Sequence, residues 1–224
     1  MIHPEYQRRA YLQAMGIDVW LPRDSDEPED SAADTVLADN LGWDELKLCV
    51  SECTRCGLST SRTQTVFGVG NKNATWMIIG EAPGAEEDRC GEPFIGRAGH
   101  MLDEMLRAVG QDRKSVFIAN ILKCRPPNNR DPKPNEALKC RDYLDHQIAL
   151  VQPSIILAVG KFAAQKLLGS DDAFEQMRGQ ARDINGIPLV VTYHPANLLR
   201  SPSQKRKSWS DLCLAQGLVA AAVE

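Results

Sequence analysis

Four of the seven cysteines lie at spacings that could hold a metal centre. Cys53 and Cys56 form a Cys-x-x-Cys pair, and Cys124 and Cys140 follow at much longer intervals. Such a pair lets two thiolates bind one centre from a single turn, and the odd number of cysteines argues against a disulfide framework. Spacing alone leaves three alternatives open. The wide separation of Cys124 and Cys140 favours a [4Fe–4S] cluster, but a zinc ion or simply buried cysteines would also account for these residues.

Polar and turn-forming residues follow three of the strands that the sequence predicts. Residues 80–84 come after the first strand, residues 123–127 after the second and His194 after the fourth. Ligands of parallel α/β sheets bind beyond the carboxyl ends of the strands. These three segments are therefore expected to meet at one rim of the sheet and to form the functional site there.

The elements that must position these residues alternate along the chain. Four nearly continuous apolar runs, typical of buried parallel strands, occupy residues 76–80, 116–122, 154–160 and 187–193. Helical patterns lie between and after them, at residues 101–109, 138–151, 162–168 and 209–219. The alternation predicts a three-layer α/β/α sandwich around a four-stranded, mainly parallel sheet with right-handed crossovers.

Charge is distributed unevenly along the chain. Residues 23–39 carry −6 while the whole chain carries −4, which leaves +2 for the remainder, and residues 113–141 carry a local +6. The acidic total therefore does not exclude a nucleic-acid partner, although a basic run can equally be a solvated face. We expect an N-terminal helical segment at 1–21, an acidic linker at 22–40 and a folded domain at 41–224.

Hydrophobic patterning argues against a membrane protein. No apolar run approaches the ~18–20 residues that a membrane helix needs, and residues 1–9 lack the apolar core of a signal peptide. Together with the odd cysteine count, these features predict a cytoplasmic protein without membrane association.

Four segments resemble motifs of the family 4 uracil-DNA glycosylases. They read GEAPG at 80–84, GEPFIGRAG at 91–99, NILKCRPPNNRDP at 120–132 and YHPANLLR at 193–200. The cysteine spacing is also similar to that of the family, in which residues corresponding to Cys53, Cys56, Cys124 and Cys140 hold a [4Fe–4S] cluster. The resemblance runs from about residue 48 to residue 214, so residues 1–45 lie outside it.

The resemblance implies a base excision repair enzyme that hydrolyses the N-glycosidic bond of uracil in DNA and leaves an abasic site. It implies that Phe94 stacks on the flipped uracil, that Asn120 reads the edge of the base, and that His194 donates a hydrogen bond to uracil O2 as negative charge develops. We expect the His194 imidazole to be neutral. No lysine in the motifs is placed for Schiff-base chemistry, so a monofunctional enzyme without a lyase step is expected.

Two further roles follow from comparison with a related glycosylase branch. That branch has an aspartate in place of Ala82, so Glu81 is the carboxylate left to orient water, or to hold the loop so that the backbone at Gly80 and Ala82 faces the uracil. It also has a tyrosine in place of Gly84. Here Glu87 is expected to fill the space near uracil C5 and exclude thymine.

DNA contacts are expected after His194 and in the loop that contains Cys124. The resemblance makes Leu198 a wedge that enters the vacated base stack. The alternative is that Leu198 and Leu199 begin the last helix and pack inward. Arg200 and Arg125 are expected to contact phosphates, and the iron–sulfur cluster is expected to be structural.

Other functions fit parts of the same sequence. A non-catalytic iron–sulfur nucleic-acid-binding module on the same fold is one alternative, but such a module has no need of Phe94, Asn120 and His194 together. A relative that bonds covalently to uracil-containing DNA is another, but residues 125–139 lack the histidine-bearing insertion of that variant. We expect a monomer that acts on uracil-containing DNA, with residues 1–21 available to dock a protein partner.

Overall fold

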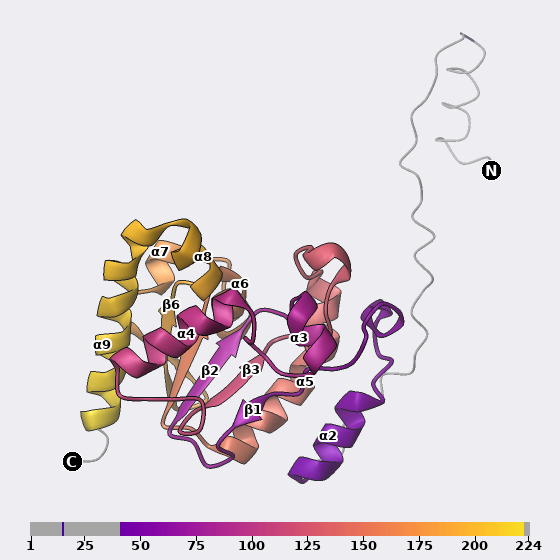
Figure 1. Cartoon of the computed structure of the whole chain (residues 1–224), viewed down its shortest axis with the longest axis horizontal. Coiled ribbons are helices and arrows are strands. Elements are labelled where there is room, and N and C mark those ends of the chain that lie inside the picture. Colours follow the sequence, from indigo (N-terminus) through magenta and orange to yellow (C-terminus); the bar gives the residue numbers. More distant parts are fainter. Residues whose placement is uncertain (1–14, 16–40, 222–224) are drawn as a thin grey trace, which may run out of the picture. The chain divides into compact units, whose positions relative to one another are not determined.

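The computed structural model describes Met15 and residues 41–221 (Figure 1). Apart from Met15, the predicted helical segment at 1–21 and the acidic linker at 22–40 lie outside the described residues, so both stay predictions. The helices are α2 (Trp43–Ser51), α3 (Ala85–Cys90), α4 (Arg97–Ala108), α5 (Pro134–Val151), α6 (Lys161–Leu168), α7 (Phe174–Met177), α8 (Pro195–Arg200) and α9 (Lys205–Ala221). Three short 3-10 helices are η1 (Gly57–Thr60), η2 (Pro127–Asn129) and η3 (Pro202–Gln204).

Six strands form one mixed sheet in the order β1-β3-β2-β4-β6-β5. Their bounds are β1 (Val69–Gly70), β2 (Trp76–Gly80), β3 (Phe117–Asn120), β4 (Ile155–Val159), β5 (Ala181–Ile184) and β6 (Ile187–Thr192). The four inner strands are parallel and match the four predicted apolar runs. β1 and β5 pair antiparallel with their neighbours at the two edges.

The number of strands predicted from the sequence was therefore wrong, because both edge strands were missed. β1 has only two residues, and every residue of β5 is at least partly exposed. An edge strand is covered less than a central one, so it lacks the continuous apolar run by which the buried strands were found. In contrast, every residue of β2, β3 and β4 is buried.

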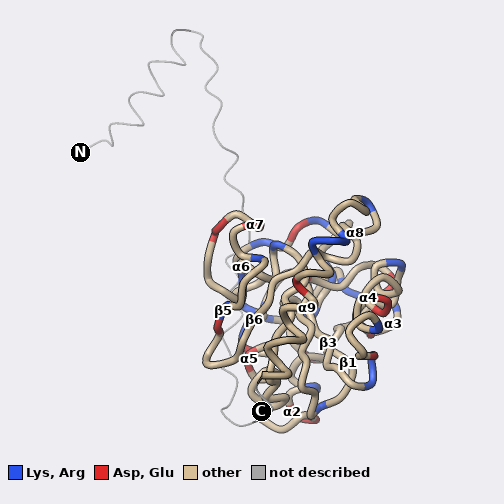
Figure 2. Tube along the Cα trace, turned by 90° about the vertical axis from the view of Figure 1, so that its left-hand side faces the viewer, with Lys and Arg blue, Asp and Glu red and all other residues tan. Residues whose placement is uncertain are grey.

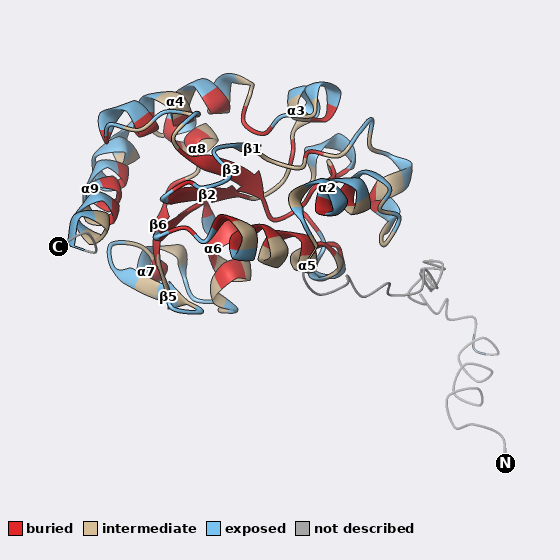
Figure 3. Cartoon of the chain, turned by 90° about the horizontal axis from the view of Figure 1, so that it is seen from below, coloured by how far each residue is buried: buried red, intermediate tan, exposed pale blue. Residues whose placement is uncertain are grey.

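Two separate apolar cores lie on the two faces of the sheet. Successive side chains of β2 alternate between them, with Met77 and Ile79 in one core and Trp76 and Ile78 in the other. Helices α5 and α6 cover the first face, and α4, α8 and α9 cover the second (Figure 3). The predicted three-layer α/β/α arrangement is thus confirmed. Within the described part of the chain, no helix combines the length and apolar character needed to span a membrane.

Strands β2 and β3 end side by side, which brings their following loops together. Gly80 is paired with Asn120 in the parallel register. Two backbone hydrogen bonds continue the pairing past the strand ends, from Ile121 N to the Gly80 carbonyl at 2.9 Å and from Leu122 N to the Glu81 carbonyl at 3.1 Å. The predicted rim is therefore built on a rigid pair of strands.

Candidate active site

A cleft of about 470 Å³ opens where the loops after β2, β3 and β6 meet. It combines residues from the four motif segments of the sequence. The lining residues are Glu81, Ala82, Pro83, Gly84, Glu87, Phe94, Ala98, Asn120, Pro126, Asn129, Arg130, Asp131, His194, Ala196 and Arg200. Most of the residues predicted to contact the base thus share one cleft.

Asn120 presents a buried amide with an unused acceptor. The residue is 2% exposed, and its Oδ1 has no hydrogen-bond partner among the described residues. A buried carbonyl oxygen without a partner costs about 1–3 kcal/mol, so a native protein keeps one mainly for a ligand. Gly80 makes room for it, because a Cβ at that position would lie 2.4 Å from Asn120 Oδ1 and 2.4 Å from Phe94 Cζ.

Phe94 contributes an aromatic face beside Asn120. Its ring centroid lies 5.6 Å from that of His194, with an angle of 32° between the ring planes. The residue is 5% exposed and adopts a left-handed backbone conformation with φ 54°. The ring, the imidazole and the amide therefore border the same space from three different loops.

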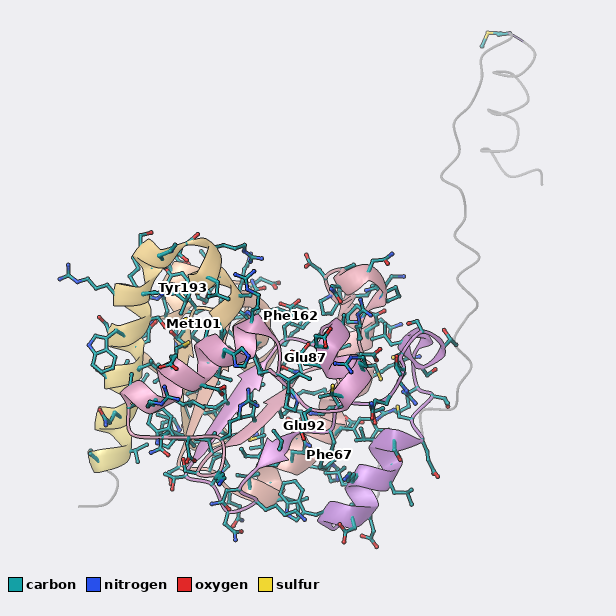
Figure 4. All side chains as sticks on the ribbon, in the orientation of Figure 1. Phe67, Glu87, Glu92, Met101, Phe162 and Tyr193 are labelled. Atoms are coloured by element: carbon teal, nitrogen blue, oxygen red, sulfur yellow. The ribbon has the colours of Figure 1, made fainter. Side chains whose placement is uncertain are left out.

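Glu87 ties two loops of the cleft together. Its Oε2 accepts from Gly84 N at 3.1 Å, and its Oε1 accepts from Ile95 N at 3.1 Å and from Gly96 N at 3.3 Å. Glu87, labelled in Figure 4, is the third residue of α3, and its bond to the N-cap residue Gly84 satisfies a backbone N–H at the start of that helix. Both carboxylate oxygens are thus engaged by backbone N–H groups, and the predicted role of Glu87 in excluding thymine stays a prediction.

His194 is held in one tautomer by the helix that it caps. As the N-cap of α8, its Nδ1 accepts from Ala196 N at 3.2 Å, so a neutral ring carries its proton on Nε2. The pKa of His194 is lowered to about 4, mainly by burial and also by the positive charge of Arg200. The imidazole is neutral at pH 7, as expected from the sequence, and offers one N–H donor.

Glu81, the carboxylate predicted to orient water, lines the cleft. Burial raises its pKa above the ordinary value, and the negative charge of Asp131 adds to this. Ala82, the next residue, lines the cleft as well and also packs against the cluster formed by Leu58, Leu122 and Cys124. The loop after β2 therefore borders both the cleft and the cysteine side.

The wedge assigned to Leu198 needs a correction. Leu198 is 1% exposed and belongs to the core between the sheet and α4, whereas Leu199 is 40% exposed. Because Pro195 starts a separate short helix, successive side chains of α8 point about 100° apart, and only one leucine can face the core. A side chain that enters DNA must be exposed, which leaves Leu199 as the candidate. The inward-packing alternative holds for Leu198 alone.

The two predicted phosphate-binding arginines, Arg200 and Arg125, lie in or next to the cleft, and Arg130 joins them. Arg200 lines the cleft and is the last residue of α8. Segments coloured blue for Lys and Arg lie near the label of α8 in Figure 2. Arg130 lines the cleft and pairs with Glu136. Arg125 donates from Nε to Asn129 Oδ1 at 2.7 Å, on the loop between the cleft and the cysteines.

Cys53, Cys56, Cys124 and Cys140 line a second, smaller cavity, together with the apolar side chains of Val50, Leu58 and Leu122. None of the seven cysteines, all of which lie in the described residues, forms a disulfide bond. Arg62 donates to Cys124 Sγ at 3.1 Å, and the Lys123 backbone N–H donates to Cys140 Sγ at 3.3 Å. Such donors stabilise the thiolate form that binds metal.

Comparison with known proteins decides the family. The uracil DNA glycosylase superfamily matches residues 67–215. The type-4 uracil-DNA glycosylase of Archaeoglobus fulgidus is 40% identical over 176 residues, which span 75% of this chain and 88% of that protein. That of Thermotoga maritima is 42% identical over 158 residues, or 70% of this chain and 82% of that protein. A type-5 uracil-DNA glycosylase of Pyrobaculum aerophilum is 30% identical over 192 residues, or 70% and 84%.

The chain belongs to the uracil DNA glycosylase superfamily. Its similarity to several type-4 members, at 37–42% identity, bears out the resemblance found in the motifs. The matched range includes every residue that lines the cleft, as well as Cys124 and Cys140. Cys53 and Cys56 precede that range, and the structure brings them to the same cavity as the other two.

The donor set of this superfamily member fits an iron–sulfur cluster. Four thiols with N–H donors on two of the sulfurs surround one largely apolar cavity. Burial raises the pKa of Cys140 to about 12, and a bound metal would deprotonate such a thiol outright. Among the described residues, no group of three or more His, Cys, Asp or Glu side chains is placed so that it could hold a metal ion, so the four thiols are related only as the lining of this cavity.

One residue that supports the glycosylase site from outside the cleft was not predicted as such from the sequence. Lys123 is buried, and its Nζ donates to the Asn120 carbonyl at 2.9 Å and to Gln147 Oε1 at 2.6 Å. It ties the end of β3 to α5, and burial lowers its pKa to about 8. A lysine between Leu122 and Cys124, at the end of an apolar strand, was the available signal.

Proposed function

We propose that the protein hydrolyses the N-glycosidic bond between uracil and deoxyribose in DNA and leaves an abasic site. The observation that carries the proposal is the unpartnered Oδ1 of buried Asn120, which faces the same cleft as Phe94 and His194. The type-4 relatives, which are named uracil-DNA glycosylases, support the same substrate.

Recognition of the base follows from the amide and the ring. Asn120 Oδ1 accepts from uracil N3–H, while its amide nitrogen donates to O4. Cytosine has no N3–H and carries an amino group in place of O4, so it leaves the same polar groups unpaired and is rejected. Stacking on the Phe94 ring contributes about 1–3 kcal/mol to the binding of the flipped base.

Bond cleavage needs stabilisation of the leaving base. As the bond between C1′ and N1 breaks, its electron pair moves onto the uracil and negative charge develops at O2. The neutral His194 donates its Nε2–H to that oxygen, in a buried position where the charge is poorly screened. The group does not need to transfer a proton.

Water supplies the other half of the reaction. Glu81, with its raised pKa, is a stronger base than an exposed glutamate. We assign it to orient the water that attacks C1′ and to accept the proton that this water loses. The uracil anion then takes a proton from solvent.

DNA is held around the cleft by arginines and opened by an exposed leucine. Arg200, Arg125 and Arg130 are assigned to phosphates, and Leu199 replaces Leu198 as the proposed wedge. A cytoplasmic location, a monomeric state and a protein partner for residues 1–21 stay predictions.

We assign a [4Fe–4S] cluster to Cys53, Cys56, Cys124 and Cys140. When bound, such a cluster supplies four strong iron–sulfur bonds that tie the segment around Cys53 to the loop after β3. That loop leads directly from Asn120 to the proposed phosphate contacts. The proposed reaction needs no electron from the cluster.

Replacement of Cys140 by alanine is expected to remove the cluster. The loop after β3, which the cluster would hold, is then expected to unfold. Purified variant protein should contain less than half of the iron of the wild type, lose the brown colour and unfold at a lower temperature. Exposed Cys213→Ala is the matched control and should keep its iron. One zinc per chain in colourless wild-type protein would contradict the assignment.

The proposed activity is tested with a labelled oligonucleotide that contains one uracil. Incubation with the full-length protein followed by alkali should cleave the strand at the uracil. Without alkali the strand should stay intact, because no lyase step is expected. Oligonucleotides with thymine or cytosine at the same position are the controls. Intact strand after alkali, with iron-loaded protein, would refute the proposal.

The pH profile of kcat/KM is expected to lack a histidine inflection near 6.5. His194 is already neutral above about pH 4, whereas the Glu81 carboxylate is lost as pH falls through its raised pKa, which lies above 4.5. The rate should therefore stay level from pH 8 downward until the pH approaches the raised pKa of Glu81, and it should fall as that carboxylate becomes protonated. Single-turnover rates measure this, and Glu81→Gln should flatten the acid limb. An inflection near 6.5 that survives in Glu81→Gln would contradict the neutral histidine.

A further inference from the structure

Phe94 has a backbone conformation that its surroundings must impose. Its φ of 54° lies in the left-handed region, which bulky side chains rarely adopt. The residue also lies in a loop, between α3 and α4, and not in a regular element. The direction of the ring depends on this conformation, because the side chain leaves the backbone at the Cα atom.

Arg113 holds the carbonyl groups on both sides of this unusual residue. Its Nη1 donates to the Pro93 carbonyl at 3.1 Å, and its Nη2 donates to the Phe94 carbonyl. Its Nε donates to Asp103 Oδ1 at 2.6 Å, which fixes the guanidinium plane from α4. Three donors of one planar group are thus used, an arrangement that lysine cannot reproduce.

The peptide groups after Phe94 are held by a second side chain. Glu87 accepts from the backbone N–H groups of Ile95 and Gly96, as described above. Gly99 lets α4 approach, because a Cβ there would lie 1.6 Å from the Phe94 carbonyl oxygen. The backbone around Phe94 is therefore held by a guanidinium on the Pro93 and Phe94 carbonyls and by a carboxylate on the Ile95 and Gly96 amides.

We propose that Arg113 is a positioning residue that sets the Phe94 ring for stacking on uracil. The inference rests on the proposed function and adds a residue from outside the cleft. Arg113 lies on a separate surface hollow with Asp103, Arg107 and Gln111, so it acts through the Phe94 backbone. Its replacement weakens the binding of the base in the ground state and the transition state alike, which raises KM more than it lowers kcat.

The matched variants are Arg113→Gln, Arg113→Lys and Arg107→Gln in the full-length protein. Arg107 is exposed on the same surface and pairs with Glu104 at 2.6 Å, so its loss controls for removal of a nearby positive charge. Arg113→Gln is expected to raise KM, and the inhibition constant of free uracil, by about tenfold with kcat within about threefold. Arg113→Lys should show a smaller rise, and Arg107→Gln none.

A double-mutant cycle with Phe94→Leu decides whether Arg113 acts through the ring. Once the ring is absent, adding Arg113→Gln should change KM and uracil inhibition by less than about twofold. Full additivity, or equal loss of kcat and kcat/KM, would overturn the proposal. So would failure of both Arg113 variants to fold, judged by thermal unfolding, because the role would then be structural. Absence of excision by the wild type would instead overturn the proposed function, and this inference with it.

Discussion

Replacement of His194 by alanine is expected to lower the single-turnover rate of uracil excision by about a hundredfold to a thousandfold. The reason is the loss of the Nε2–H donor at the point where negative charge develops on the base. Binding of uracil-containing DNA should change by less than about threefold, because the hydrogen bond to O2 strengthens mainly in the transition state. Single-turnover kinetics and a binding titration on the same oligonucleotide separate the two effects.

The same substitution also removes the N-cap of α8. A control must therefore separate a loss of helix stability from a loss of the catalytic hydrogen bond. His194→Asn keeps a side-chain acceptor suited to the cap and should restore the unfolding temperature without restoring the full rate. His100→Ala removes a histidine whose side chain is 81% exposed, and it should leave the rate unchanged. A wild-type rate in His194→Ala would exclude the residue from the chemistry.

The central part of the fold was predictable because its sequence signal is local. Strands β2, β3 and β4 are buried at every position, and each appears as a short continuous apolar run. The rule that ligands bind beyond the carboxyl ends of parallel strands then brought Glu81, Asn120 and His194 together, and the cleft confirms that they share one rim.

The orientation of the two leucines was not predictable in the same way. Their direction depends on where the helix begins, and Pro195 starts it three residues before Leu198. A change of one residue in that start moves each side chain by about 100°. The motif indicated that a leucine faces DNA, but only the structure distinguishes buried Leu198 from exposed Leu199.

The supporting contacts were beyond sequence reasoning because they are long-range and made to backbone. Arg113 donates to the carbonyls of residues 93 and 94, which no spacing or residue type indicates. Lys123 looks like part of a basic run, yet it is buried against Gln147, twenty-four residues away. Such residues shape the site without carrying a recognisable motif.

Replacement of Asn120 by aspartate is expected to lower kcat/KM for uracil by about a hundredfold, or about 2.7 kcal/mol of barrier. The carboxylate can still accept from N3–H, but it has no N–H to donate to O4 and repels that oxygen instead. Burial raises the pKa of a carboxyl at this position, because the residue is only 2% exposed. A protonated aspartic acid offers one donor and one acceptor, and its proton can lie on either oxygen, so it can donate to cytosine N3 and accept from the cytosine amino group as well as match the uracil edge. The loss for uracil is therefore expected of the ionised carboxylate.

Excision of cytosine by Asn120→Asp is therefore the specific outcome to look for, and it should increase as pH falls and the new carboxyl becomes protonated. Uracil- and cytosine-containing oligonucleotides are compared at matched pH with alkaline strand cleavage as the readout. Asn185→Asp is the control, since Asn185 is exposed in the turn before β6, where aspartate tolerates the left-handed conformation. An unchanged preference for uracil at an unchanged rate would contradict the assignment, because the unpartnered Oδ1 would then serve no function in reading the base.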